Sequence, residues 1–318
     1  MKKYIIIVLL ICQATLAGTA KDSLDLNYSR YVPAYEFEDF CDACGCSASG
    51  GGMGFSSMLN QNFVGLRYMY QSYTSREGIF NNSPWIDENF NTIQAWARIP
   101  VFKNFQVSAL VPYHFNSRTP STGKQTIEGI GDITLLGLYT IYQTHKDSTL
   151  FVHTLQAGAG VKAPTGKYNG ANNGSVNPSF QLGTGSWDYM LATEYVIKHK
   201  QWGFNTMLNY ILKTKNDEHY QFGDQFNYAG TLFYVVEKEK LTLVPQVGLA
   251  GEVYASNRQY DEDVPNTKGD ILFGKAGLEV GSGKFSMGVN AMLPISQNLT
   301  GGKVEANYRL AINLNYSL

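Results

Sequence analysis

The chain has 318 residues, a formal net charge of −1 and only 16% charged residues. A charge balance without a basic excess argues against a nucleic-acid-binding protein. The 32 glycines and 21 tyrosines leave the chain poor in helix formers and rich in residues that favour strands. The composition therefore favours an all-β protein.

The first twenty residues have the pattern of a secretory signal peptide. Lys2 and Lys3 form a positive start, the stretch from Tyr4 to Cys12 is apolar, and Ala17 and Ala20 offer small-residue cleavage sites. The apolar stretch is too short to span a bilayer as a helix, and the remaining sequence has no run of about eighteen apolar residues. We therefore expect an exported protein without a membrane-spanning helix.

Residues 21–59 differ from the rest, because they lack alternation and become glycine-rich after Cys46. We expect this segment to be a periplasmic extension or a plug in the mouth of a barrel. Cys41, Cys44 and Cys46 have the spacing C-x-x-C-x-C, which lets thiolates converge on one soft ion such as Cu(I) or Zn(II). Met53 could add a thioether to this site. The alternative is a disulfide between two of these cysteines, because the periplasm is oxidising.

From Asn60 to Leu318, segments with alternating apolar and polar residues recur along the chain. The last of them, Val304–Leu318, alternates without a break to the final residue, so one face of a strand would be apolar and the other polar. About twelve such segments are present, beginning near residues 64, 93, 106, 132, 151, 186, 202, 226, 241, 272, 285 and 304. An even number of alternating strands is typical of a bacterial outer-membrane β-barrel, and we expect residues 60–318 to form one, antiparallel and up-and-down.

The connections between these segments alternate between short and long in the sequence. The short ones are expected at 101–104, 143–148, 198–201, 237–240 and 281–284. The long ones are expected at 74–89, 116–128, 164–178, 213–220, 255–269 and 296–303. Outer-membrane barrels have short periplasmic turns and longer extracellular loops, which this order matches.

The charged residues of the segments fall on the polar face, which we expect to line the lumen. A basic side chain at the bilayer midplane costs about 2–4 kcal/mol, so the register that turns these charges inward is favoured. They could line a solute path or form a lattice of ion pairs that fills the barrel. The expected lumen-lining residues are Arg67, Arg98, Asp132, Lys162, Asp188, Glu194, Lys275 and Glu279.

Three prolines, Pro112, Pro245 and Pro294, lie within the strand patterns. Proline cannot donate to a strand ladder, and a closed barrel has no free edge. We therefore expect bulges or strand ends at these positions.

Several short motifs resemble a family of outer-membrane β-barrels named for transport in the phenol meta-degradation pathway. These are Gly129-Ile130-Gly131-Asp132 at the start of a strand, Lys162-Ala163-Pro164-Thr165-Gly166 at the end of one, and Gly183-Thr184-Gly185-Ser186-Trp187-Asp188 before the next. The resemblance covers about residues 60–318 and implies passage of small molecules, hydrophobic or aromatic compounds among them. The cysteine segment is not part of the family's pattern.

Three hypotheses for function follow from these patterns. The first is an outer-membrane channel or transporter for a small solute, and the second is a metal-handling protein that uses the cysteines. The third is a structural barrel or adhesin. The sequence has no nucleophile elbow, so we do not expect an enzyme. The expected partners are outer-membrane lipid, a small-molecule or metal solute, and the barrel-assembly machinery, which would recognise the C-terminal strand.

The metal hypothesis predicts stoichiometric Cu(I) or Zn(II) on the purified mature protein, lost when Cys41, Cys44 and Cys46 are all replaced by Ser. Elemental analysis together with a free-thiol count checks this. Equal metal in both proteins would end the hypothesis, and one free thiol without metal would support the disulfide.

Overall fold

The computed structural model describes residues 57–59, 62–78, 82–144 and 151–318. The predicted signal peptide, Cys41, Cys44, Cys46 and Met53 lie outside these residues, so the predictions made for them stay predictions. Among the described residues, no helix combines the length and the apolar character that crossing a membrane requires.

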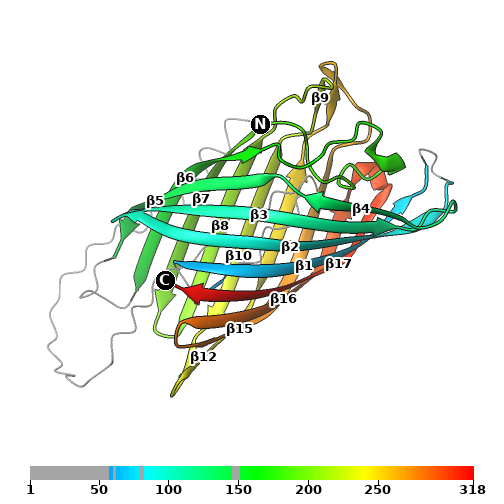
Figure 1. Ribbon diagram of the computed structural model, residues 1–318. Coiled ribbons are helices and arrows are strands. Elements are labelled where there is room, and N and C mark those ends of the chain that lie inside the picture. Colours follow the sequence, from blue (N-terminus) through cyan, green and yellow to red (C-terminus); the bar gives the residue numbers. More distant parts are fainter. Residues whose placement is uncertain (1–56, 60–61, 79–81, 145–150) are drawn as a thin grey trace, which may run out of the picture. The chain divides into compact units, whose positions relative to one another are not determined.

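Long antiparallel strands make up most of the described chain (Figure 1). The barrel wall consists of β1 (Phe63–Arg76), β2 (Trp85–Phe102), β3 (Phe105–Arg118), β5 (Ile133–Gln143), β6 (Val152–Ala163), β7 (Asp188–His199), β8 (Trp202–Leu212), β10 (Gln225–Tyr234), β12 (Leu241–Tyr254), β15 (Gly269–Ser282), β16 (Phe285–Asn298) and β17 (Val304–Ser317). Two short strands extend this sheet, β4 (Gln125–Ile130) beside β3 and β11 (Val236–Lys238) beside β12. The long connections hold a small sheet of β9 (Tyr220–Gln221), β13 (Arg258–Gln259) and β14 (Glu262–Asp263), and the single turns η1 (Asn172–Gly174) and η2 (Thr300–Gly302).

The sheet closes on itself. Each wall strand pairs with the wall strands before and after it in the chain, and β1 pairs antiparallel with the last strand, β17. At the seam, Phe63 lies opposite Ser317, and the Leu318 amide donates to the Asn62 carbonyl at 3.1 Å. The described chain therefore forms a closed up-and-down barrel of twelve strands, which confirms the fold expected from the alternating segments.

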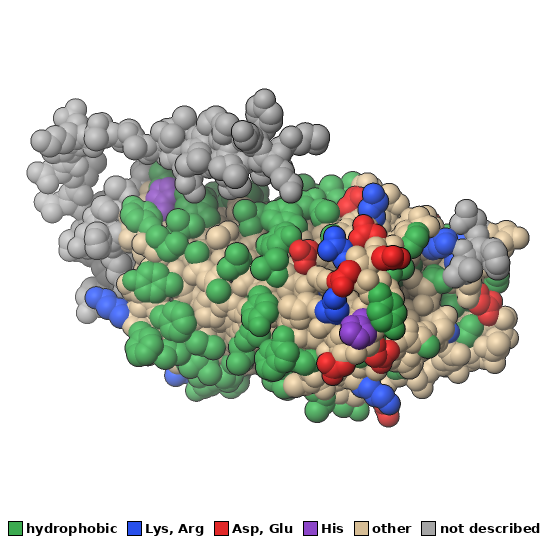
Figure 2. Space-filling view, turned by 90° about the horizontal axis from the view of Figure 1, so that it is seen from above, with side chains coloured by type: hydrophobic (Ala, Val, Ile, Leu, Met, Phe, Trp, Pro, Cys, Tyr) green, Lys and Arg blue, Asp and Glu red, His purple; other side chains and the backbone are tan. Residues whose placement is uncertain are grey.

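The two faces of the wall differ as the alternation predicts. Outward-facing side chains are apolar and exposed, for example Leu66, Val247 and Leu278, whereas Arg67 and Gln246 beside them are buried inside. Exposed aromatic residues lie near the strand ends, with Phe102, Trp202, Phe285 and Tyr316 at the short-turn end and Trp85, Trp187 and Tyr189 at the long-loop end. Figure 2 shows hydrophobic side chains spread over the wall, while charged side chains gather toward one end. This is the lipid-facing band with aromatic girdles of an outer-membrane barrel.

Successive connections lie at alternate ends of the barrel, as expected. Their lengths alternate between short and long less strictly than the sequence suggests. At one end, residues 103–104, 200–201, 239–240 and 283–284 form two-residue turns, whereas the connection 144–151 is longer. At the other end the connections run up to 164–187, but 299–303 has only five residues. The expected loops 74–89 and 296–303 shrink because their flanking strands continue pairing beyond the predicted ends.

The last strand corrects one detail of the sequence interpretation. Its alternation does not run unbroken, because Val304 and Ala306 are buried inside whereas Tyr308, Leu310 and Ile312 are exposed outside. The register against β1 shifts here, with Ser72 opposite Tyr308 and Tyr73 opposite Ala306. One extra residue in β17 forms a bulge, which moves the following side chains to the opposite face.

The three prolines occupy places where a neighbouring ladder is interrupted. Pro112 lies between the end of the β5 pairing at Leu110 and the start of the β4 pairing at Tyr113. Pro245 lies between the β10 partner Gln246 and the β11 partner Leu243. Pro294 lies at a register shift against β15, beyond the last residue of β16 that pairs with β17. The register shift at Pro294 is the expected bulge, whereas β3 and β12 continue through Pro112 and Pro245, where it is a neighbouring strand that ends.

Two substitutions one residue apart test the assignment of the faces. Val247→Lys places a charge in lipid near the middle of β12 and should lower the free energy of unfolding by about 2–4 kcal/mol. Gln246→Lys places the same charge in the lumen and should cost much less. Urea titration of the protein folded into phospholipid vesicles measures both values, and equal losses would contradict the register.

Candidate functional site

The inner wall of the barrel carries the charged residues that the sequence places there. All eight are buried: Arg67, Arg98, Asp132, Lys162, Asp188, Glu194, Lys275 and Glu279. They do not form one cluster. Asp132, Lys162 and Asp188 come together, whereas the others contact different parts of the wall or its connections.

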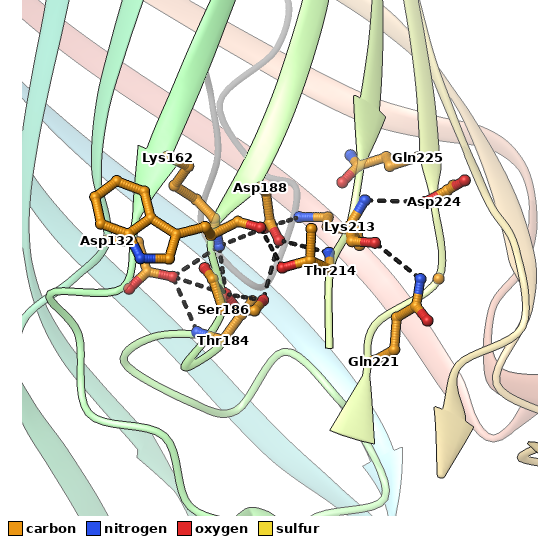
Figure 3. A network of polar contacts seen from close by, with 12 residues as sticks. Asp132, Lys162, Thr184, Ser186, Asp188, Lys213, Thr214, Gln221, Asp224 and Gln225 are labelled. Atoms are coloured by element: carbon orange, nitrogen blue, oxygen red, sulfur yellow. Dashed lines mark hydrogen bonds and ion pairs between the residues drawn. The ribbon is translucent and has the colours of Figure 1, made fainter. Parts of the chain in front are cut away.

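Lys162, at the end of β6, lies between two carboxylates (Figure 3). Its Nζ is 2.7 Å from Asp132 Oδ2 and 2.7 Å from Asp188 Oδ2, and it donates to Thr184 Oγ1 at 2.6 Å. Lys213 Nζ adds a second cation, 3.2 Å from Asp188 Oδ2. Two lysines therefore balance two aspartates at the long-loop end of the lumen, and buried charges paired in this way form a structural lattice.

This lattice also fixes the backbone of the connection 164–187. Asp132 accepts hydrogen bonds from the amides of Gly166 at 2.9 Å and Thr184 at 2.9 Å. Asp132 precedes β5, while the two amides lie near the two ends of the connection. The glycine motifs that flank Asp132 and Thr184 thus place a carboxylate against backbone donors, and both ends of the connection are held at the same point of the rim.

From this anchor the connection 164–187 reaches β2, three strands away from β6 in the order of the wall. Glu88 of β2 accepts hydrogen bonds from Ser175 Oγ at 2.6 Å and from Asn177 Nδ2 at 2.8 Å. Phe180 is fully buried and meets Phe90 of β2 edge to face, with ring centroids 6.0 Å apart. β3 and β5 lie between β2 and β6, so the connection folds inward past two strands of the wall. The connection is therefore an inward-folded loop, called the lumen loop below.

A pocket of about 60 Å³ remains beside the lumen loop, and its lining includes Tyr73, Asn177, Lys213 and Tyr254. The two tyrosines belong also to a polar contact inside the barrel. Arg309 Nη1 lies 2.6 Å from Glu252 Oε1, Arg309 Nε donates to the Tyr73 hydroxyl at 3.1 Å, and Tyr254 donates to Glu252. Since β15 and β16 separate β12 from β17, the Arg309–Glu252 pair spans two strands and narrows the lumen next to the pocket.

The other mouth is occupied by the residues that precede the barrel. Ser57 Oγ and the Met58 amide each donate to Glu279 of β15 at 2.5 Å. Met58 is buried and packs with Val196, Phe233 and Val244 of three different wall strands. The described end of the N-terminal segment, residues 57–59, therefore lies inside the short-turn mouth. The remainder of the segment predicted to be a plug lies outside the described residues.

The remaining predicted residues are spread over the wall. Arg67 donates to Gln94 and lies 4.5 Å from the Trp96 ring centroid. Glu194 accepts from Asn205 Nδ2 at 2.5 Å, and Lys275 is buried on β15. Arg98 donates from Nε to Ser108 Oγ at 3.3 Å. Among the described residues, no group of three or more His, Cys, Asp or Glu side chains could hold a metal ion.

Sequence reasoning missed several residues of this site. Glu88 lies in a stretch predicted to be a loop, although its position on the inner face of β2 follows from the alternation once the strand is extended. Ser175, Asn177 and Phe180 lie in a polar connection without periodicity, so no local signal shows that they fold inward. Glu252 and Arg309 are visible as inward charges, but their pairing depends on the curvature of the barrel.

Outside the wall, the loop sheet of β9, β13 and β14 carries its own ion pairs. A hydrogen bond from Lys215, with its positive charge, lowers the pKa of Asp261, and the two groups lie 2.6 Å apart. Burial raises the pKa of Tyr220 to about 12, although the hydrogen bond with Asn257 opposes this shift. These groups hold the long connections together.

The lattice predicts a large difference between buried and exposed ion pairs. Lys162→Met leaves Asp132 and Asp188 without their shared cation, which should lower the free energy of unfolding by about 3–5 kcal/mol. Lys215→Met removes an exposed lysine from Asp261 and should change stability little. Urea unfolding in vesicles measures both variants, and a small loss for Lys162→Met would show that the lattice does not stabilise the barrel.

Comparisons with known proteins agree with this architecture. An outer membrane channel from Pseudomonas putida F1 superposes with a TM-score of 0.61 at 16% identity, over 83% of this chain and 98% of that chain. The β domain of the Bordetella autotransporter BrkA gives a TM-score of 0.50 at 8% identity, over 81% of this chain and 100% of that one. At these identities the likeness shows the fold, which is that of bacterial outer-membrane barrels.

No curated protein sequence matches this chain. Residues 96–274, more than half of the chain, match the model of the family described as "Putative MetA-pathway of phenol degradation". The match includes the three glycine motifs around Asp132, Lys162 and Asp188 that form the rim lattice. The chain therefore belongs to this family of barrels.

Proposed function

We propose that the protein is an outer-membrane channel for a small solute, and that both of its mouths are closed in the state described here. The wall is closed and its inner face is polar, so a solute that crosses must pass through the lumen. The lumen loop covers one mouth and residues 57–59 occupy the other. The family membership and the likeness to the Pseudomonas putida channel support this proposal.

One observation carries the proposal: the segments that close the mouths are not part of the wall. Arg118 of β3 donates to the Asn173 carbonyl of the lumen loop, and each segment also donates to one wall carboxylate, Glu88 for the lumen loop and Glu279 for residues 57–59. The partners are hydroxyl, amide and backbone groups, which water can replace when a segment leaves. A barrel built only as a scaffold would have no need of closing segments that can be released without opening the sheet.

The inner surface supports a solute that is at least partly apolar. One wall carries Leu136 and Leu138 of β5, Met190 of β7 and Met207 of β8, all buried within the barrel. Flexible methionine side chains adapt to varied apolar partners. Polar and charged groups of β1 and β2 lie elsewhere on the inner face. This combination suits small amphipathic molecules better than inorganic ions.

The channel hypothesis predicts that weakening the hold on residues 57–59 increases solute uptake. Glu279→Ala removes the acceptor of Ser57 and Met58, and two hydrogen bonds to a charged group should shift the open fraction about tenfold or more. Liposome-swelling rates with small neutral solutes measure this. Glu77→Ala, which removes a carboxylate bonded to Ser121 in exposed loops, is the matched control.

Unchanged swelling in folded Glu279→Ala, together with no swelling after deletion of residues 21–59, would overturn the channel hypothesis. That outcome would favour a structural barrel or adhesin, for which binding of a partner would depend on the loops. The metal-handling alternative depends on Cys41, Cys44 and Cys46, and the described residues supply no further metal-binding group to it.

Outer-membrane insertion through the barrel-assembly machinery is part of the same proposal. The supporting feature is β17, an amphipathic strand that forms the seam with β1. Export by the N-terminal signal peptide completes this route.

A further inference from the structure

Arg98 differs from the other buried cations for which partners are known. It lies on the inner face of β2 and is 1% exposed. Its Nε donates to Ser108 Oγ at 3.3 Å, but Nη1 and Nη2 have no hydrogen-bonding partner among the described residues. Lys162 and Arg309, by contrast, each contact carboxylates at 2.7 Å or less.

The chemistry of this position favours an anion. A buried guanidinium without a partner for its two terminal nitrogens is costly, so an anion that pairs with it gains the full strength of a charge-assisted bond. Nη1 and Nη2 form the fork that binds a carboxylate through two parallel hydrogen bonds. Ser108 beside it fixes the orientation of the fork through Nε.

A second donor lies on the same face of the same strand. Trp96, two residues before Arg98, is 3% exposed, and its Nε1 has no hydrogen-bonding partner among the described residues. The Trp96 ring packs against Phe63, with ring centroids 4.4 Å apart, and Arg67 covers it. This part of the inner wall therefore presents hydrogen-bond donors next to aromatic rings.

The position within the barrel fits a site on a solute path. Arg98 lies opposite Phe63, the first residue of β1, which places it near the short-turn mouth. This is the mouth that residues 57–59 occupy. A solute bound at Arg98 would therefore lie at the mouth into which residues 57–59 fold.

We propose that Arg98 forms a binding subsite for the carboxylate of a small organic anion inside the lumen, with Trp96 beside it. The inference deepens the proposed channel function, because it names the charge of the solute, and it rests on that function for the route of access. Neutral molecules of the same shape bind weakly at this site, and cations are repelled.

Equilibrium dialysis of the full mature chain in detergent, with radiolabelled benzoate as the probe, tests the subsite. Arg98→Gln should weaken benzoate binding about tenfold or more, because it removes the charge and the fork. Arg98→Lys keeps the charge and should retain part of the affinity. Arg258→Gln removes the same charge from an exposed loop strand and should leave binding unchanged. Retained heat-modifiable migration in gels shows that each variant is folded.

Two further measurements locate the probe and define its class. Benzoate should change the tryptophan emission of the unmodified chain but not that of Trp96→Phe, because the other three tryptophans, Trp85, Trp187 and Trp202, are on the outer surface. Benzyl alcohol should compete poorly with benzoate, and so should chloride at the same concentration.

The subsite is overturned if the unmodified chain does not bind benzoate, or if Arg98→Gln binds it equally well. Displacement by equimolar chloride or benzyl alcohol would also overturn the assignment to a carboxylate. The proposed channel function is tested by a different measurement, the flux of solutes into liposomes, so the two proposals can fail independently. Benzoate binding without flux would refute the channel and leave the subsite, whereas flux without benzoate binding would refute the subsite alone.

Discussion

The structure depends on one constraint: hydrocarbon offers no hydrogen bonds to a backbone, so every strand inside the membrane needs a partner on both sides. Closure of β1 on β17 meets this need and leaves no free edge in the wall. The prolines show how tightly the constraint applies. Each of them lies where a neighbouring ladder is already interrupted, so the missing N–H removes no bond that the sheet requires.

The same constraint places the two faces of the wall in different surroundings, with lipid outside and the lumen inside. Outward positions meet lipid and carry apolar side chains, and the charged residues away from the strand ends lie on inward positions. Charges buried in a narrow lumen lose hydration, and this lowers the stability of the barrel unless the charges are paired. The pairs Lys162 with Asp132 and Asp188, and Arg309 with Glu252, satisfy this need within the wall and its rim. They also set where a loop can be attached, because Asp132 binds the backbone of the lumen loop.

Much of the fold could be predicted from the sequence, because a period of two is a local property that hydrocarbon enforces along each strand. Strand number, strand positions and the inward set of charges all follow from it. The bulge in β17 could not be predicted, because Val304 and Ala306 are apolar and fit either face. The contacts that bring the lumen loop and residues 57–59 into the barrel could not be predicted either. Glu88 meets Ser175 across 87 residues and Glu279 meets Ser57 across 222, and no local pattern records such contacts.

The inward charges divide into two kinds by the groups that satisfy them. Lys162 and Arg309 are paired with opposite charges. Removal of one partner would leave the other charge unpaired inside the barrel, where it is poorly solvated. Glu88 and Glu279 accept from neutral donors, which include groups of the lumen loop and of residues 57–59 as well as Ser286 of β16, and water can take over these bonds at small net cost. Ion pairs thus join parts of the wall, while bonds with neutral groups hold the lumen loop and residues 57–59 against it. Glu88 and Glu279 take no part in the ion pairs of Lys162 and Arg309, whereas Asp132 and Lys162 serve both kinds of contact, because they also bind the lumen loop.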